Sequence, residues 1–334
     1  MSTLKIEETA PAVTGTSTLV RFLPAIVLVA AVIGAAVVLP MVGHDQSART
    51  WYRGLIGGSS LYRLDTIFAR LLPFVIGAAI AVALLERGRR QRHVAASGES
   101  LRRHELSEVI AHWGNAVGVG LCLITATWLR RWFGRPFSLE TTYVLHFIGA
   151  GLIMAAVAHH ITFQRVGGGT GLIPKRRADF KNALAEMVGY TGVYRGLRGA
   201  FGVQMPAAVR RPAQRILRKW NLVPDPDGKY LATEKVLSYS LWAVLIGVVV
   251  ITGVIKTLRY AVSLPGGLLH WATYLHDGAT IFLIVLLALH IGALVLVPRN
   301  WPLLKSMFTT RVSRAYAKAH LPLWVEEEET AEKP

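Results

Sequence analysis

Long uncharged apolar runs dominate this 334-residue sequence and restrict the folds that are open to it. Hydrophobic residues make up 52% of the chain, and a helix needs about 20 apolar residues to cross a bilayer. Spanning segments fold as helices because the hydrocarbon offers backbone groups no water to bond. The sequence therefore predicts an all-α membrane protein with six transmembrane helices, at residues 20–42, 66–86, 108–130, 141–163, 236–257 and 272–297.

The placement of the basic residues predicts the orientation of these helices. The chain carries 37 Lys and Arg against 20 Asp and Glu, a net charge of +17. Most of the basic residues lie in residues 1–21, 86–107, 164–235 and 298–334, which alternate with poorly basic connections. Basic loops stay on the cytoplasmic side. We therefore expect a multi-pass protein of the inner (plasma) membrane with cytoplasmic termini, whose partner is the lipid bilayer rather than nucleic acid.

Cysteine usage excludes several redox centres. Cys122 is the single cysteine, and it lies inside the third predicted span. The chain alone therefore forms no disulfide, no Cys-x-x-Cys-His attachment of haem and no iron–sulfur cluster.

Two histidines on the last predicted span indicate a binding site. His276 and His290 are fourteen residues apart, so both lie on one face of a helix, about 21 Å apart along its axis. Ionisable residues inside a membrane mark functional sites, and imidazole is an axial ligand of haem iron. This spacing leaves room for two stacked haems. The alternative is a haem-free bundle in which the histidines bond to backbone carbonyls.

The predicted topology sorts the histidines by depth. His146 and His276 fall at the outer level of the membrane, and His112 and His290 fall at the inner level. Two bis-histidine pairs follow from this sorting. His160 is a rival for the inner position because it also lies fourteen residues from His146, and spacing alone does not separate it from His112.

These residues resemble the gamma subunit, a cytochrome b556, of the membrane-bound formate dehydrogenases, over about residues 103–326. The resemblance rests on His112-Trp113 entering the first core helix, on His146 opening the second and on the spaced pair in the fourth. The most specific match is the tail between Arg311 and Trp324, RVSRAYAKAHLPLW. Di-haem cytochromes b of hydrogenases and other molybdoenzymes form the wider family.

The resemblance implies the architecture and the cofactors. A four-helix di-haem core would occupy residues 101–326, after a two-helix extension at 1–100 and before an acidic tail at 327–334. It implies two haem b groups, the outer one held by His146 and His276 and the inner one by His112 and His290. His112 is thereby favoured over His160.

The resemblance also implies the function. The chain would anchor a respiratory complex, accept electrons from an iron–sulfur subunit and pass them to menaquinone or ubiquinone. Catalysis would belong to a partner subunit that carries molybdenum or tungsten. The alternatives are the cytochrome b of a hydrogenase or of another molybdoenzyme and, from another class, a haem-free anchor or transporter.

The quinone site is the point at which the sequence departs from that family. The family places an asparagine after a Lys-Tyr pair, whereas Lys229-Tyr230 is followed here by Leu231. The remaining candidates for quinone contacts are Tyr230, Glu234 and Trp113.

Overall fold

The computed structural model describes residues 18–44, 59–88, 99–166, 171–174, 177–194, 199, 203–223, 225, 228–259 and 262–331. Most of these residues are helical. The longer helices are α1 (Thr18–His44), α3 (Ser59–Gly88), α4 (Leu106–Leu129), α5 (Leu139–Val166), α8 (Trp242–Leu258) and α9 (Gly266–Val295). A π-helical segment, η1 (Glu234–Leu241), leads directly into α8.

Five helices in the described part of the chain are long and apolar enough to cross a membrane. They confirm five of the six predicted spans and lie at Phe68–Glu86, Leu106–Leu129, Leu139–Arg165, Glu234–Leu258 and Gly266–Val295. The first predicted span falls on α1, whose side chains are described over the apolar stretch Leu23–Val37, which is shorter than a span requires. The span at residues 20–42 therefore stays a prediction, as do the cytoplasmic termini.

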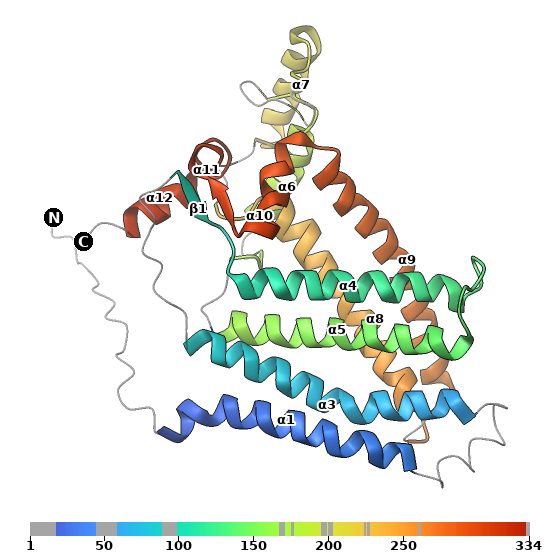
Figure 1. The fold of residues 1–334 in the computed structure, drawn as a ribbon. Helices are drawn as coiled ribbons and strands as arrows, with labels where there is room; N and C mark the ends of the chain where they lie inside the picture. Colours follow the sequence, from blue (N-terminus) through green and yellow to red (C-terminus); the bar gives the residue numbers. More distant parts are fainter. Residues whose placement is uncertain are drawn as a thin grey trace.

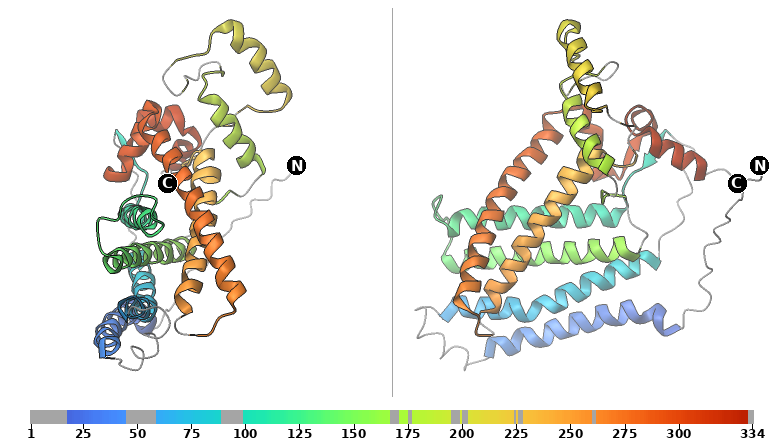
Figure 2. Two further views of the ribbon diagram at one scale, coloured as in Figure 1. Left: turned by 90° about the vertical axis from the view of Figure 1, so that its right-hand side faces the viewer. Right: turned by 180° about the vertical axis from the view of Figure 1, so that it is seen from behind.

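The long helices form two groups (Figure 1). Helices α1, α3, α5 and α4 lie side by side in that order, and α8 packs against α9. Figure 2 shows that α8 and α9 cross the first group on one of its faces. The histidines of α5 and α9 therefore meet where the two groups cross.

An apolar cluster joins the four helices of the predicted core. It contains one buried residue from each of α4, α5, α8 and α9, namely Val119, Ile153, Ile246 and Leu283. Helices α4 and α5 touch backbone to backbone, since a Cβ on Gly149 would lie 2.8 Å from the Gly118 carbonyl oxygen. Small residues allow this approach within a membrane.

A second apolar cluster caps one end of the bundle. Strand β1 (Ser100–Arg102) pairs antiparallel with β2 (Arg311–Ser313), so that Leu101 faces Val312. Beside them lie η2 (Pro298–Asn300), α10 (Trp301–Thr309), α11 (Arg314–His320) and α12 (Pro322–Ala331). The cluster also includes Leu231 and Trp324. The residues just before α4 are thereby fixed to the end of the chain.

The basic loop between α5 and η1 contains two helices, α6 (Arg177–Gly189) and α7 (Ala207–Lys219). A short helix at Asp179 to Val188 is predicted from the sequence, and α6 confirms it. Part of α6 is buried, and its buried residues include Ala183, Ala185 and Glu186. Helix α7 buries no residue and extends beyond α6 in Figure 1.

Candidate functional site

His146 of α5 and His276 of α9 face each other where the two groups of helices cross. Their ring centroids are 6.4 Å apart. A metal–imidazole bond of about 2.0 Å, with roughly 1.2 Å from the nitrogen to the ring centre, would place two imidazoles on opposite sides of one metal about 6.4 Å apart. The spacing of this pair therefore fits axial ligation of a single metal ion.

Two buried threonines orient these imidazoles. Thr125 Oγ1 lies 2.9 Å from His146 Nδ1, and Thr252 Oγ1 lies 3.0 Å from His276 Nδ1. Each hydroxyl donates its own hydrogen to a carbonyl one turn earlier, that of Leu121 or Val248. The hydroxyl oxygen must then accept from Nδ1–H, which assigns the proton to Nδ1 and leaves the lone pair on Nε2. Both Nε2 atoms are thereby available to a metal, and such outer partners raise ligand basicity.

A cavity of about 390 Å³ surrounds this pair. Its inner wall is apolar, and His146 and His276 lie in it beside Cys122. Gly253 lies under the second imidazole, since a Cβ there would be 3.4 Å from His276 Cε1. The other lining residues that enter the arguments below are Phe68, Phe147, Arg130, Lys256, Arg259 and Asp277.

The donor set bears on what the cavity can hold. In the part of the chain that the structure describes, no group of three or more His, Cys, Asp and Glu side chains gathers to bind a metal ion. A metal between His146 and His276 would therefore have to bring its remaining ligands with it. Haem does so, because the porphyrin supplies four nitrogens and leaves two axial positions for the protein.

The inner histidines lie near each other. His112 of α4 and His290 of α9 are close enough for their imidazoles to interact electrostatically. His112 is exposed and His290 is half-buried. His112 meets the ring of Trp113 edge on, and Trp113 Nε1 donates to the Met307 carbonyl at 2.8 Å.

The rival histidine has a different neighbour. His160 Nε2 lies 3.2 Å from the Tyr239 hydroxyl of η1. The adjacent His159 Nε2 lies 2.9 Å from Glu86 Oε2 of α3. The structure thus groups His112 with His290, and it groups His160 with Tyr239.

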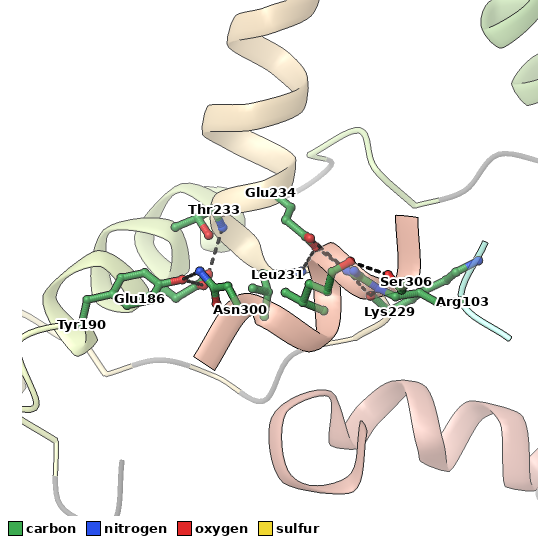
Figure 3. A network of polar contacts seen from close by, with 10 residues as sticks. Arg103, Glu186, Tyr190, Lys229, Leu231, Thr233, Glu234, Asn300 and Ser306 are labelled. Carbon is green, nitrogen blue, oxygen red and sulfur yellow. Dashed lines mark hydrogen bonds and ion pairs between the residues drawn. The ribbon is translucent and has the colours of Figure 1, made fainter. Parts of the chain in front are cut away.

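Figure 3 shows a polar network that includes Glu234, which is close enough to His290 to interact with it electrostatically. Arg103, 2% exposed, donates to both carboxylate oxygens of Glu234, at 3.0 and 2.7 Å, and to the Lys229 carbonyl. Glu234 in turn accepts from the Leu231 backbone N–H at 2.9 Å. The Arg103 guanidinium also lies over the Tyr230 ring, 5.4 Å from its centroid. Tyr230 and Glu234 therefore have structural partners here, as Trp113 has in α10.

Leu231, at the position of the family asparagine, belongs to the apolar cluster of the cap and is 4% exposed. An asparagine there would bury its amide among apolar side chains. This explains why a leucine is compatible with the local packing.

His104 is a buried residue of this region that the sequence did not single out. It is 8% exposed, and its Nε2 has no hydrogen-bond partner among the described residues. Burial, reinforced by the nearby charges of Arg103 and Lys229, lowers the pKa of His104 to about 3. An orphaned neutral imidazole beside His112 is able to donate to, or accept from, a bound group.

The Figure 3 network continues through a second carboxylate, also not singled out from the sequence. Glu186 of α6 accepts from the Thr233 backbone N–H at 3.0 Å and from the Tyr190 hydroxyl at 3.2 Å. Burial raises the pKa of Glu186, although the hydrogen bonds from Thr233 oppose this effect. Asn300 donates to the Tyr190 hydroxyl at 3.4 Å.

A comparison with known protein families places this geometry in context. The sequence pattern of one family, described as prokaryotic cytochrome b561, matches residues 103–310. This is more than half of the chain. The chain belongs to the prokaryotic cytochrome b561 family. A comparison with curated proteins found no match.

Membership of the cytochrome b561 family implies that the chain binds haem b and is a membrane cytochrome that transfers electrons. The matched residues include α4, α5, α8 and α9, and therefore all four candidate ligands. Helices α1 and α3 lie outside the match.

Proposed function

We propose that this chain is the membrane-anchoring di-haem cytochrome b of a formate dehydrogenase-like complex. In this proposal it takes electrons from an iron–sulfur subunit, whose own partner carries molybdenum or tungsten, and delivers them to menaquinone or ubiquinone. The family match supports haem b and electron transfer, and the resemblance of residues 103–326 supports this choice of partners. The observation that carries the proposal is the outer pair, in which two opposed imidazoles have their Nε2 atoms free of the threonines.

The four histidines would supply the axial ligands. His146 and His276 would hold one haem in the cavity at the outer level, and His112 and His290 would hold the other at the inner level. Haem iron accepts and releases single electrons by cycling between its ferric and ferrous states. The role of the protein is to fix two such sites at different depths, on helices that exclude water between them.

Residues around the inner pair would serve the quinone. Glu234 is the first residue of the π-helical segment and Tyr230 lies four residues before it. Such irregularities are frequent at functional sites. Arg103 Nη2 donates to both carboxylate oxygens of Glu234 and forms an ion pair with it. In the proposal, Glu234, Tyr230 and Trp113 shape the pocket, and His104 offers its unpartnered Nε2 to a quinone oxygen.

Haem quantitation tests the ligand scheme. Pyridine haemochrome analysis of the purified wild type should give two b haems per chain. His146→Ala and His276→Ala should each remove the same haem, and His112→Ala and His290→Ala should each remove the other. His160→Ala is the matched control and should keep both. If His160→Ala removes a haem while His112→Ala does not, the inner assignment fails.

The choice of partner needs a separate experiment. An affinity tag on the C-terminus should co-purify an iron–sulfur subunit and a molybdenum or tungsten subunit from native membranes, and formate should reduce the b haems in that complex. Reduction by hydrogen instead would identify a hydrogenase cytochrome. Absence of haem from the preparation would support an anchor or transporter.

A further inference from the structure

The outer cavity carries more positive than negative charge. Arg130, Lys256 and Arg259 line it, whereas Asp277 is the single carboxylate among its lining residues. Arg130 forms an ion pair with Asp277. Lys256 has neither an ion pair nor a hydrogen bond among the described residues, and it lies close enough to Arg130 and Arg259 to be repelled by both. The structure thus gathers cations at one end of a cavity with an apolar interior.

This arrangement is costly unless an anion enters the cavity. Lys256 is half-buried within the span Glu234–Leu258. An ionised side chain at such a depth needs a partner or a path to water. Lys256 also lies near the imidazoles of His146 and His276. An anion that binds Lys256 therefore belongs to a group that reaches the histidine pair.

We propose that Lys256, together with Arg130, binds the carboxylates of the outer haem. This inference rests on the haem assignment above and extends it to the side chains that fix how the group is turned in the cavity. Haem b carries two propionates on one edge, opposite an apolar edge. The cations lie at the ends of α4 and α8 and the apolar wall lies deeper, so the propionate edge would face the outer surface. Charge-assisted hydrogen bonds of this kind are roughly twice as strong as neutral ones.

Reconstitution with a modified haem tests this orientation. Apoprotein from haem-deficient cells is titrated with haem b or with haem dimethyl ester, in which both carboxylates are blocked. Esterification should weaken binding to the wild type by about tenfold, the factor expected for one lost hydrogen bond to a charged group. Lys256→Met should show a smaller ester penalty than the wild type, because only Arg130 then remains to bind a carboxylate, and Lys256→Arg should restore the full penalty. The control Lys305→Met, at an exposed position of α10, should behave as wild type.

Two results would overturn the proposal. One is an equal ester penalty in wild type and Lys256→Met, and the other is no ester penalty in the wild type. Failure of the haem assignment itself gives a different result. In that case His146→Ala would not change the spectrum obtained with haem b or with its dimethyl ester. The midpoint potential gives a second readout. Removing a cation beside the haem should lower the potential of the outer haem alone, since the cation favours the reduced form.

A second feature, independent of haem, is the apolar stripe on α7. Val209, Ile216 and Trp220 are 56%, 52% and 66% exposed and lie on one side of a helix, at spacings of seven and four. The opposite side carries the basic residues Arg211, Arg215 and Arg218. This is the pattern of a helix that lies in a membrane interface.

Local hydrogen bonds fix the position of α7. Gln214 Nε2 donates to the Val193 carbonyl at 2.7 Å, and the Tyr194 hydroxyl donates to the Leu222 carbonyl at 2.7 Å. In Figure 1 the helix lies beyond α6, at the end of the molecule where the C-terminal end of α9 lies. The charge pattern assigns that end of α9 to the cytoplasm.

We infer that α7 lies on the cytoplasmic leaflet, with its apolar stripe among the acyl chains and its arginines on anionic phospholipid headgroups. Because the loop joins two membrane-spanning helices, a bilayer is within reach of α7. Basic residues near such a leaflet each contribute about 1 kcal/mol of attraction. The complementary charge favours anionic lipid as the occupant of this face.

Fluorescence quenching tests this second proposal. Tryptophan emission is measured for the wild type and for Trp220→Phe, both in nanodiscs. The difference between the two spectra is the contribution of Trp220. Brominated phosphatidylglycerol should quench this contribution more than brominated phosphatidylcholine does, and aqueous iodide should quench it little. Replacing Arg211 and Arg215 by Gln should abolish the difference between the lipids. The control is Trp324, which is 2% exposed and should respond to neither quencher.

Strong quenching by iodide with none by brominated lipid would place α7 in water and overturn the proposal. That result would indicate that the apolar stripe of α7 binds a protein partner instead. Equal quenching by the two lipids would overturn the preference for anionic headgroups.

Discussion

The threonine hydroxyls determine what the outer histidines can do. A hydroxyl that already donates to a backbone carbonyl can only accept from Nδ1–H, so the tautomer that leaves Nε2 free follows from helix geometry. Sequence patterns identified the histidines because ionisable residues are rare within spans. They did not identify Thr125 or Thr252, because each lies on a different helix from its histidine and only the packing of α4 on α5 and of α8 on α9 brings them together.

Removing one hydroxyl should tune the outer haem without removing its ligands. Thr252→Val keeps the shape of the side chain but leaves the Nδ1–H of His276 without its acceptor, so the imidazole becomes a weaker donor to iron. We expect a higher midpoint potential for the outer haem and haem affinity lower by about 10- to 100-fold. Redox titration and haem retention measure the two effects. Thr162→Val, on the inner part of α5, is the control, and a shift of equal size there would contradict the assignment.

Burial of His104 predicts a dependence of stability on pH. Its pKa is lowered from 6.5 to about 3 in the folded chain. Between these values the unfolded chain binds a proton that the folded chain does not, so folding becomes less favourable as the pH falls from about 6.5 toward 3. The contribution is fully present above pH 6.5 and amounts to at most about 1.4 kcal/mol per pH unit in this window.

His104→Gln should reduce this acid sensitivity in detergent unfolding experiments at pH 7 and pH 5. The exposed His270→Gln serves as the control and should retain the slope of the wild type. A slope unchanged in His104→Gln would assign the acid sensitivity to other groups.

At the scale of elements, the contact of α4 with α5 is the closest in the core. A Cβ on Gly149 would lie 2.8 Å from the Gly118 carbonyl oxygen and 2.9 Å from Cys122 Sγ, whereas a Cβ on Gly120 would meet nothing within 4 Å. Glycine beside a histidine is compatible with two readings of the sequence, porphyrin contact or helix packing. The structure uses Gly149 for helix packing, and Gly253 is the glycine that lies under an imidazole.

A pair of alanine substitutions tests this contact. Gly149→Ala should push α4 away from α5 and destabilise the fold, and it should weaken the outer haem because Thr125 and His146 would separate. Gly120→Ala, on the open side of α4, should be neutral or stabilise by up to about 1 kcal/mol through helix propensity. Thermal unfolding in detergent and haem content provide the measurements. Equal effects of the two substitutions would show that the close approach does not matter.

At the scale of the whole molecule, apolar patterning predicted the elements better than their arrangement. Five spans and α6 follow from runs of apolar residues and from local sequence. Helix α7 was missed because Pro212 and five basic residues in a short segment obscure its stripe. The excess of cations in the outer cavity was also not predicted, since Arg130 and Lys256 come from different helices and each by itself reads as an interfacial residue.

Helix α3 gives the N-terminal extension a definite relation to the site. Phe68 lines the outer cavity and stacks on Phe147, with ring centroids 4.8 Å apart. The residues that match the cytochrome family do not include α3. The extension thus forms one wall of a cavity whose two histidines lie on α5 and α9.

Deleting residues 1–98 should therefore leave the four proposed haem ligands in place but open this wall. We expect both haems in the freshly purified variant and a faster transfer of the outer haem to apomyoglobin, with the inner haem unchanged. The single substitution Phe68→Ala should shift the same rate in the same direction. Equal loss of both haems would indicate a general failure of folding. An unchanged rate of haem transfer would show that α3 does not contribute to the site.

The pairing of β1 with β2 has a consequence for biosynthesis. Ser100 pairs with Ser313, so the strand that precedes the core stays without its partner until the chain has been synthesised as far as Ser313. At about 5–20 residues per second, the intervening segment of about 200 residues takes roughly 10–40 s to synthesise. During that interval the spans can insert one by one, but the cap of Leu101, Val312 and Trp324 cannot close. Closure of the cap thus follows the synthesis of Ser313, and it marks a chain in which α9 has already been made.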